Sequence, residues 1–164
     1  MKNRTMQKVF AFIDSQNLNL GVRSQGWTLD FKRFLVYLKD KFQVNKAFLF
    51  IGYIPENKDL YKYLKESGYQ IIFKPVLKSR QPKVKTKGNV DAELVLHTMI
   101  QLPKFSKAII VSGDGDFYCL IEYLYRKQKL KKLIVPNRKY SSLLRKYGSF
   151  IVNIDLMKKK LAKK

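Results

Sequence analysis

The sequence predicts an α/β fold, a three-layer α/β/α sandwich in which helices cover both faces of a mainly parallel sheet. Three observations support this prediction. Apolar runs of strand length alternate along the chain with longer helical stretches. The 164 residues suffice for one domain with a sizeable core. The hydrophobic content of 46% argues against a chain that is disordered as a whole.

The first half of the chain shows the alternation clearly. An apolar run over residues 9–13 predicts the first strand, and apolar residues at helical spacing predict a helix over 30–42. A second strand is expected at 47–53. A helix over 57–66 follows, which a Ser-Gly pair ends, and then a third strand at 69–74.

The second half continues the same pattern. Asn89 is a suitable N-cap for a helix over 90–102, and Pro103 closes that helix. The remaining expected elements are strands at 108–112, 133–136 and 150–154 and helices at 117–128 and 141–146.

We expect a single domain over residues 1–156, followed by a basic tail over 157–164 that is frayed and solvated. The segment 74–87 carries basic residues and no acid, and its two prolines argue against a regular element. Cys119 has no partner within the chain and lies in an apolar helical run, which predicts a buried cytosolic thiol.

The charge of the chain predicts a polyanionic partner. A formal net charge of +22 far exceeds what solubility requires. Nucleic acid is favoured over a membrane, because the basic residues are spread along the chain and no amphipathic or lipidation signal accompanies them. No signal-length or membrane-length apolar segment occurs, so a soluble, cytoplasmic protein is expected. Association into a homodimer stays open.

Four aspartates are the candidate metal ligands. Asp14 follows the first strand, Asp114 and Asp116 follow the fourth, and Asp91 opens a helix. If the first and fourth strands are neighbours, these acids converge at the carboxyl edge of the sheet. Two carboxylates about 5 Å apart repel by roughly 3 kcal/mol at an effective dielectric near 20. Such a cluster must be protonated, paired with Lys or Arg, or neutralised by metal, for which oxygen ligands favour Mg²⁺ or Mn²⁺.

Polar and small residues accompany the acids. Asn17 and Ser112 could orient a carboxylate or a metal-bound water. Gly113 and Gly115 would let the backbone turn sharply and approach a phosphate. The simpler interpretation of the Asp-Gly run is a turn with an aspartate N-cap.

Three short motifs in this order resemble the NYN domain, in its LabA-like branch, within the PIN-like nuclease superfamily. They are Phe12-Ile13-Asp14-Ser15-Gln16-Asn17, Lys87-Gly88-Asn89-Val90-Asp91 and Val111-Ser112-Gly113-Asp114-Gly115-Asp116-Phe117. The resemblance runs from about Lys8 to Asp155.

The resemblance implies a PIN-like, Rossmann-like fold and a metal-dependent ribonuclease. Asp14, Asp91, Asp114 and Asp116 would then be metal ligands and catalytic acids, with Asn17 and Ser112 as accompanying polar residues. The expected substrate is single-stranded RNA, although DNA is not excluded. Which RNA is cut, and whether internally or from an end, stays open.

One position departs from the pattern. Many LabA-like sequences carry a further aspartate six residues after the position of Asp91, and this chain has His97 there. A contact between Glu93 and His97, four residues apart on a helix, is the simple expectation. The departure favours the alternative of a nucleic-acid-binding or regulatory module that keeps the pocket without catalysis. A haloacid-dehalogenase-type phosphatase is less well supported, because Asp14 lacks the second aspartate of an Asp-x-Asp pair.

Cations near the acids are candidates for binding nucleic acid. Five of them precede Asp91 in a segment that could guide substrate or could be a solvated loop; they are Lys78, Arg80, Lys83, Lys85 and Lys87. Tyr53, Tyr61 and Tyr63 could stack on unpaired bases, but their spacing is equally typical of core residues.

Overall fold

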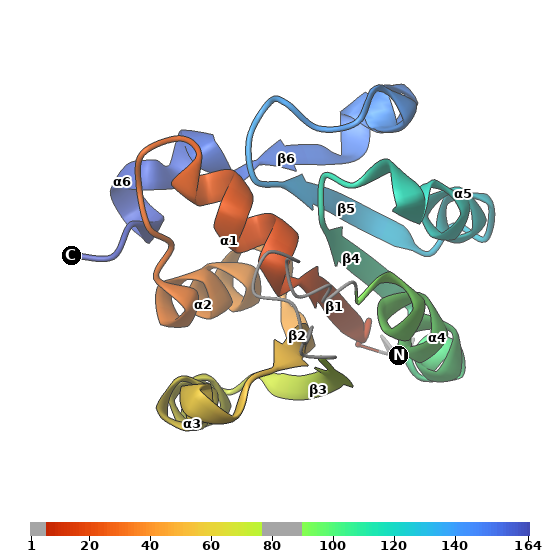
Figure 1. Cartoon of the computed structure of the whole chain (residues 1–164). Coiled ribbons are helices and arrows are strands. Elements are labelled where there is room, and N and C mark those ends of the chain that lie inside the picture. Colours follow the sequence, from red (N-terminus) through yellow and green to blue (C-terminus); the bar gives the residue numbers. More distant parts are fainter. Residues whose placement is uncertain (1–5, 77–89) are drawn as a thin grey trace.

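In a computed structural model, which describes residues 6–76 and 90–164, the described residues form a fully parallel sheet with order β3-β2-β1-β4-β5-β6 (Figure 1). The strands are β1 (Val9–Asp14), β2 (Val44–Tyr53), β3 (Gln70–Pro75), β4 (Lys107–Val111), β5 (Leu130–Val135) and β6 (Ile151–Asn153). The predicted strands therefore all exist, with ends shifted by a few residues.

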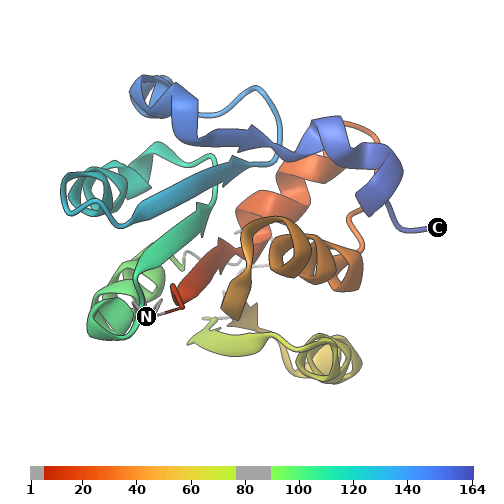
Figure 2. The same cartoon turned by 180° about the vertical axis from the view of Figure 1, so that it is seen from behind.

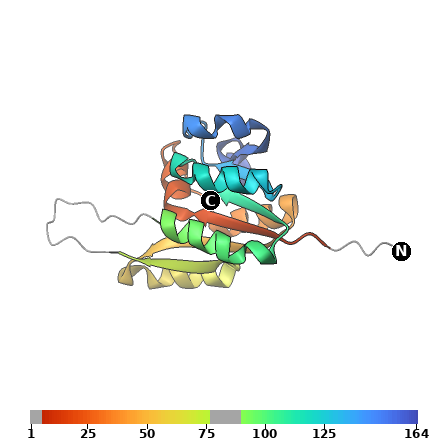
Figure 3. The same ribbon diagram turned by 90° about the vertical axis from the view of Figure 1, so that its right-hand side faces the viewer.

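Helices cover both faces of this sheet, as the three-layer prediction requires. One face carries α1 (Ser15–Arg23), α2 (Phe31–Phe42), α3 (Lys58–Ser67) and α6 (Lys158–Leu161). The other carries α4 (Asp91–Gln101), α5 (Tyr118–Arg126) and the 3₁₀ segment η4 (Ser142–Phe150), and α4 and α5 lie in front of the sheet in Figure 3. Short 3₁₀ turns complete the described chain at Pro55–Asn57, Leu102–Lys104, Gly115–Phe117 and Ile154–Met157. No helix among the described residues is long and apolar enough to cross a membrane.

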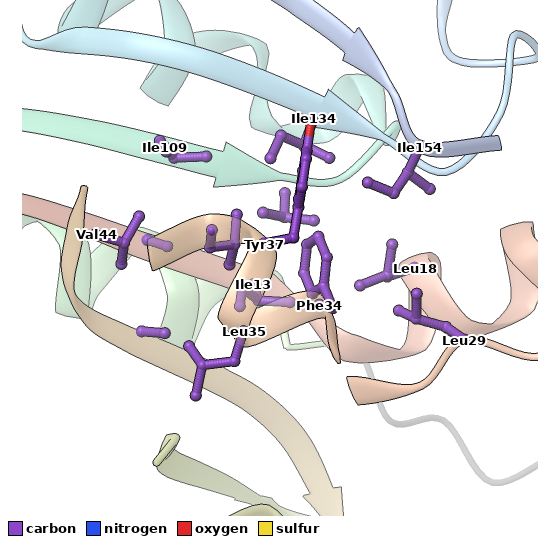
Figure 4. Packing of buried hydrophobic residues seen from close by; sticks show 14 of the residues in the cluster. Ile13, Leu18, Leu29, Phe34, Leu35, Tyr37, Val44, Ile109, Ile134 and Ile154 are labelled. Carbon is purple, nitrogen blue, oxygen red and sulfur yellow. The ribbon is translucent and has the colours of Figure 1, made fainter. Parts of the chain in front are cut away.

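The central strands divide their side chains between two apolar cores. Ala11 and Ile13 of β1 point to the α1 and α2 side, whereas Phe10 and Phe12 point to the α4 and α5 side. Phe34 of α2 is fully buried in the first core (Figure 4). The strand β1 is thus buried on both faces, and α1 begins directly after it, at Ser15.

The sequence patterns did not predict α1. Asp14 caps this helix, since its side chain accepts a hydrogen bond from the N–H of Asn17. The helix contains glycine and asparagine, which are poor helix formers, and only one side of it is buried. Gly21 is required there because a Cβ would collide with Pro136.

The tail over 157–164 is not frayed as predicted but packs beside α2 (Figure 2). Leu161 is fully buried, and its carbonyl accepts a hydrogen bond of 2.9 Å from the N–H of Asp30. The N–H of Lys163 donates to the carbonyl of Thr28 at 2.8 Å. Backbone pairing and apolar side chains, buried Leu161 with partly buried Met157 and Ala162, therefore hold a lysine-rich segment on the domain.

We predict that Leu161→Ala lowers the free energy of unfolding by about 2 kcal/mol, the lower end for deletion of a buried leucine, since the site lies near a chain end. Urea denaturation followed by circular dichroism checks this, with exposed Leu156→Ala as the matched control. Equal stability of the two variants would show that the tail contributes nothing to the fold.

Two smaller expectations were also wrong. Cys119 is exposed on α5, because the buried stripe of this helix falls on its neighbours. The helix expected at 141–146 does form, as the 3₁₀ helix η4, and it extends to Phe150. Pro75 belongs to β3, where its missing N–H is tolerated because β3 lies at the edge of the sheet. Asn89, the expected N-cap, lies outside the described residues.

Three lysines at the amino-terminal edge of the sheet bind backbone carbonyls where helices end. Lys131 donates to the carbonyl of Phe42 at 2.8 Å, Lys107 to that of Gln128 at 2.6 Å, and Lys129 to that of Phe105 at 2.6 Å. Burial, with the charge of Lys107 nearby, lowers the pKa of Lys131. These cations satisfy carbonyls that have no partner within a helix and neutralise the negative ends of the helix dipoles.

Candidate metal centre

The adjacency of β1 and β4 brings the predicted acidic motifs together. The two strands pair in parallel, with Ile13 opposite Val111. The order of the sheet reverses between them, so the loops after these strands diverge and leave a crevice at the carboxyl edge. Asp14, Gly113 and Asp114 line this crevice.

Asp14 is the most buried acid of the site, with 5% of its surface exposed. One carboxylate oxygen accepts from the N–H of Asn17 at 3.2 Å, and the other from the hydroxyl of Ser112 at 3.3 Å. Burial raises the pKa of Asp14 from 3.8 to about 6, and the charges of Asp91 and Asp114 add to the rise, while the bonds from Asn17 and Ser112 oppose it.

A chain of hydrogen bonds fixes the loop after β4. The side-chain oxygen of Asn17 accepts from the N–H of Gly113 at 2.8 Å, which ties α1 to this loop. The hydroxyl of Ser112 accepts from the N–H of Asp114 at 3.1 Å, and Asp114 accepts from the N–H of Asp116 at 2.9 Å. The acids are therefore held on backbone that Asn17 and Ser112 position.

Three of the four acids form one compact group. Asp91, Asp114 and Asp116 each offer a carboxylate oxygen, and these oxygens lie within 4.8 Å of one another. Asp91 comes from the first turn of α4, so the group joins two elements far apart in the sequence. Asp14 lies deeper and is coupled to the group through its electrostatic interactions with Asp91 and Asp114.

The donor set fits a hard divalent cation. Asp14, Asp114 and Asp116 form no ion pair with any described lysine or arginine. Their repulsion is therefore not relieved by cationic side chains of the described part of the chain. Carboxylate oxygens at this spacing suit Mg²⁺ or Mn²⁺.

Asp14, Asp91 and Asp114 line a cleft of about 820 Å³, and Asp116 lies beside the latter two. Gln16, Lys139 and Tyr140 also line it, and the sequence analysis did not select them. Lys139 and Tyr140 follow β5, whose carboxyl end lies at the same edge of the sheet. Their position after the fifth predicted strand was the signal that could have found them.

The glycines of the loop also make room for a neighbouring segment of the chain. A Cβ on Gly113 would approach Tyr140 Cβ to 3.2 Å, and a Cβ on Gly115 would collide with Ser141. Neither glycine has a positive φ. They allow the segment after β5 to pack against the acidic loop, and thereby help to form the wall of the cleft.

His97 and Glu93 do not make the expected contact with each other. The imidazole of His97 packs against the ring of Phe50, with centroids 5.7 Å apart. Glu93 forms an ion pair with Lys74, at 3.7 Å. The aromatic contact with Phe50 thus holds His97 on the side of α4 that faces the sheet.

The five predicted substrate-guiding cations, Lys78, Arg80, Lys83, Lys85 and Lys87, lie outside the described residues. Tyr61 is buried, and it packs with Tyr53 and Phe73. Tyr63, in contrast, is 42% exposed. Of the two tyrosines on α3, Tyr63 is therefore the one whose ring is largely open to solvent.

Comparison with known proteins finds a family model, a curated relative and a solved structure that this chain resembles. The family model described as the NYN domain matches residues 8–155. The chain is 27% identical, over 134 aligned residues, to the low amplitude and bright protein LabA of Synechococcus elongatus, covering 71% of this chain and 67% of that protein. It also resembles the crystal structure of a protein of unknown function from Vibrio parahaemolyticus, with a TM-score of 0.78, 25% identity, and coverage of 99% of this chain and 100% of that one.

Proposed function

Because the chain belongs to the NYN domain family of the PIN-like nuclease superfamily, we propose that it is a metal-dependent ribonuclease that hydrolyses phosphodiester bonds in single-stranded RNA. The observation that carries this proposal is the group formed by Asp91, Asp114 and Asp116, with oxygens within 4.8 Å of one another beside buried Asp14. Asp91 and Asp114 of this group line a cleft of about 820 Å³.

In this proposal, Asp14, Asp91, Asp114 and Asp116 hold one or two Mg²⁺ or Mn²⁺ ions. The bound ion would lower the pKa of water and offset the charge that develops on the phosphate oxygens. Ser112 keeps the carboxylate of Asp14 oriented through the hydrogen bond that its hydroxyl donates.

Other side chains near the scissile phosphate have separate roles in this proposal. Asn17 fixes the acidic loop through the N–H of Gly113, so the carboxylates need little reorganisation when substrate arrives. Lys139 lines the same cleft and can hold a backbone phosphate without reading sequence. His97 is packed against Phe50, which supports a mechanism that does not use histidine as the general base.

A cleavage assay tests the proposal. Single-stranded RNA should be cut in Mn²⁺ or Mg²⁺, and the activity should vanish in chelator and return when the ion is restored. RNA that is bound but never cut, with either ion, would instead favour the non-catalytic module, for which the departure at His97 is the supporting observation.

We also expect binding of single-stranded RNA to depend steeply on salt, because the net charge of +22 implies phosphate contacts. With about three to five neutralised phosphates, affinity should fall roughly 20- to 100-fold between 50 and 200 mM salt. Fluorescence anisotropy in chelator measures this without cleavage. A dissociation constant that is flat across this range would contradict phosphate recognition.

A further inference from the structure

A second cavity of about 430 Å³ lies at the carboxyl ends of β2 and β3, between α1 and α3. Its floor is apolar and includes Leu49, Ile51 and Leu64. Gln16 lines both this cavity and the acidic cleft, so the two are neighbours along one edge of the sheet. A strand that passes through the cleft can therefore continue into the second cavity.

The aromatic residues of this cavity suit a planar ring. Tyr63 lines it and is 42% exposed, and its hydroxyl lies 3.5 Å from the carboxylate of Asp30. Phe31 and Tyr61 also belong to the wall. The hydroxyl of Tyr61 is already bonded to the backbone at Gly52 and Ile54, so this side chain is rigid. An exposed tyrosine ring beside a fixed apolar floor is a stacking platform for a base.

Three side-chain amides line the same cavity, from Gln16, Asn19 and Asn57. Among the described residues, none of these amides takes part in a hydrogen bond, although Asn19 and Asn57 are half-buried. An amide offers both a donor and an acceptor, which matches the mixed edge of a nucleobase. An aliphatic ligand would leave these groups unsatisfied.

Two exposed cations, Arg23 and Lys163, also line the cavity, and Asp30 is the one acid among its described lining residues. Lys163 is held there by the bond from its N–H to Thr28. The packed tail thus supplies a positive charge next to the cavity. This charge suits the phosphates that flank a base in a single strand.

We propose that this cavity is a nucleobase-binding subsite for the single-stranded substrate, with Tyr63 stacking on the base and Arg23 and Lys163 holding the adjacent phosphates. The inference rests on the proposed function, because the base belongs to the strand that is cut in the neighbouring cleft. The combination of an aromatic wall, amides without hydrogen bonds in the described part of the chain and nearby cations favours a nucleotide over a peptide or a lipid.

The test uses a labelled RNA tetranucleotide and its four variants that lack one base each, with affinity measured by anisotropy in chelator. In the wild-type protein, loss of the base at one position should weaken binding about tenfold, in the range of one base stacked on an aromatic ring. The Tyr63→Ala variant should bind the intact tetranucleotide about tenfold more weakly than the wild type does. Removal of the base at that position should then weaken binding no further.

Tyr123→Ala is the matched control, since Tyr123 is 38% exposed and lies on α5, at the other face of the sheet. It should keep both the affinity and the dependence on position. A flat response of the wild type, or the same response in Tyr63→Ala, would overturn the subsite. Because binding is measured without metal, absence of cleavage would reject the nuclease activity alone, and cleavage with a flat response would reject the subsite alone.

Discussion

Asp114→Asn should lower the rate of Mn²⁺-dependent RNA cleavage by at least about 100-fold, because it removes one negative charge from the group that would hold the ion. The fold should be unaffected. Asparagine keeps a side-chain oxygen that can accept from the N–H of Asp116, as Asp114 does at 2.9 Å. The measurement is a single-turnover time course with labelled single-stranded RNA.

Asp40→Asn provides the control for this result, since Asp40 is an exposed carboxylate on α2, remote from the cleft lining. It makes the same change in net charge and should leave the rate unchanged. The unfolding free energy of both variants should stay within about 1 kcal/mol of the wild type. Undiminished cleavage by Asp114→Asn would reject the assignment of the acids.

Asp14→Asn should stabilise the metal-free protein by up to about 3 kcal/mol at pH 7.5, since the pKa of Asp14 rises from 3.8 to about 6 in the fold. The native state binds a proton between these two values that the unfolded state does not. The wild type therefore loses stability as pH rises from about 4 to about 6, and the loss persists above that range. Asparagine carries no charge and can still accept from the N–H of Asn17.

Urea denaturation in chelator between pH 4 and pH 8 measures this difference. Groups other than Asp14 titrate in both proteins, so the difference between the two curves isolates this carboxyl. The variant should also lose cleavage, because Asp14 would be a metal ligand. A variant that is less stable than the wild type at pH 7.5 would show that the carboxylate is not destabilising in the fold.

Much of the fold could be predicted because its strands are apolar and short. The strands around Ile13 and Val111 are buried on both faces, and such runs are easily recognised. The acids were expected to converge if these two strands are neighbours, and β1 does pair with β4. This order of strands brings Asp14 beside the loop that carries Asp114 and Asp116, whereas Asp91 joins them from the first turn of α4.

Other features depend on contacts that no local pattern contains. The helix α1 was missed because tertiary packing of Leu18 and Val22 compensates for its weak propensity. The tail was predicted wrongly because its many lysines indicated a solvated segment, while its few apolar residues, chiefly Leu161, pack on the core. The ion pair of Glu93 with Lys74 joins a helix to an edge strand, which helical spacing alone cannot indicate.

The lysines at the amino-terminal edge of the sheet bear on how this cationic protein could be engineered. The ammonium groups of Lys107, Lys129 and Lys131 donate hydrogen bonds to carbonyls of the chain itself. Part of the net positive charge therefore stabilises the fold. A variant with fewer lysines, made to reduce nonspecific binding of polyanions, should keep these three lysines. Glutamine could replace outward-facing lysines such as Lys62 without loosening the scaffold.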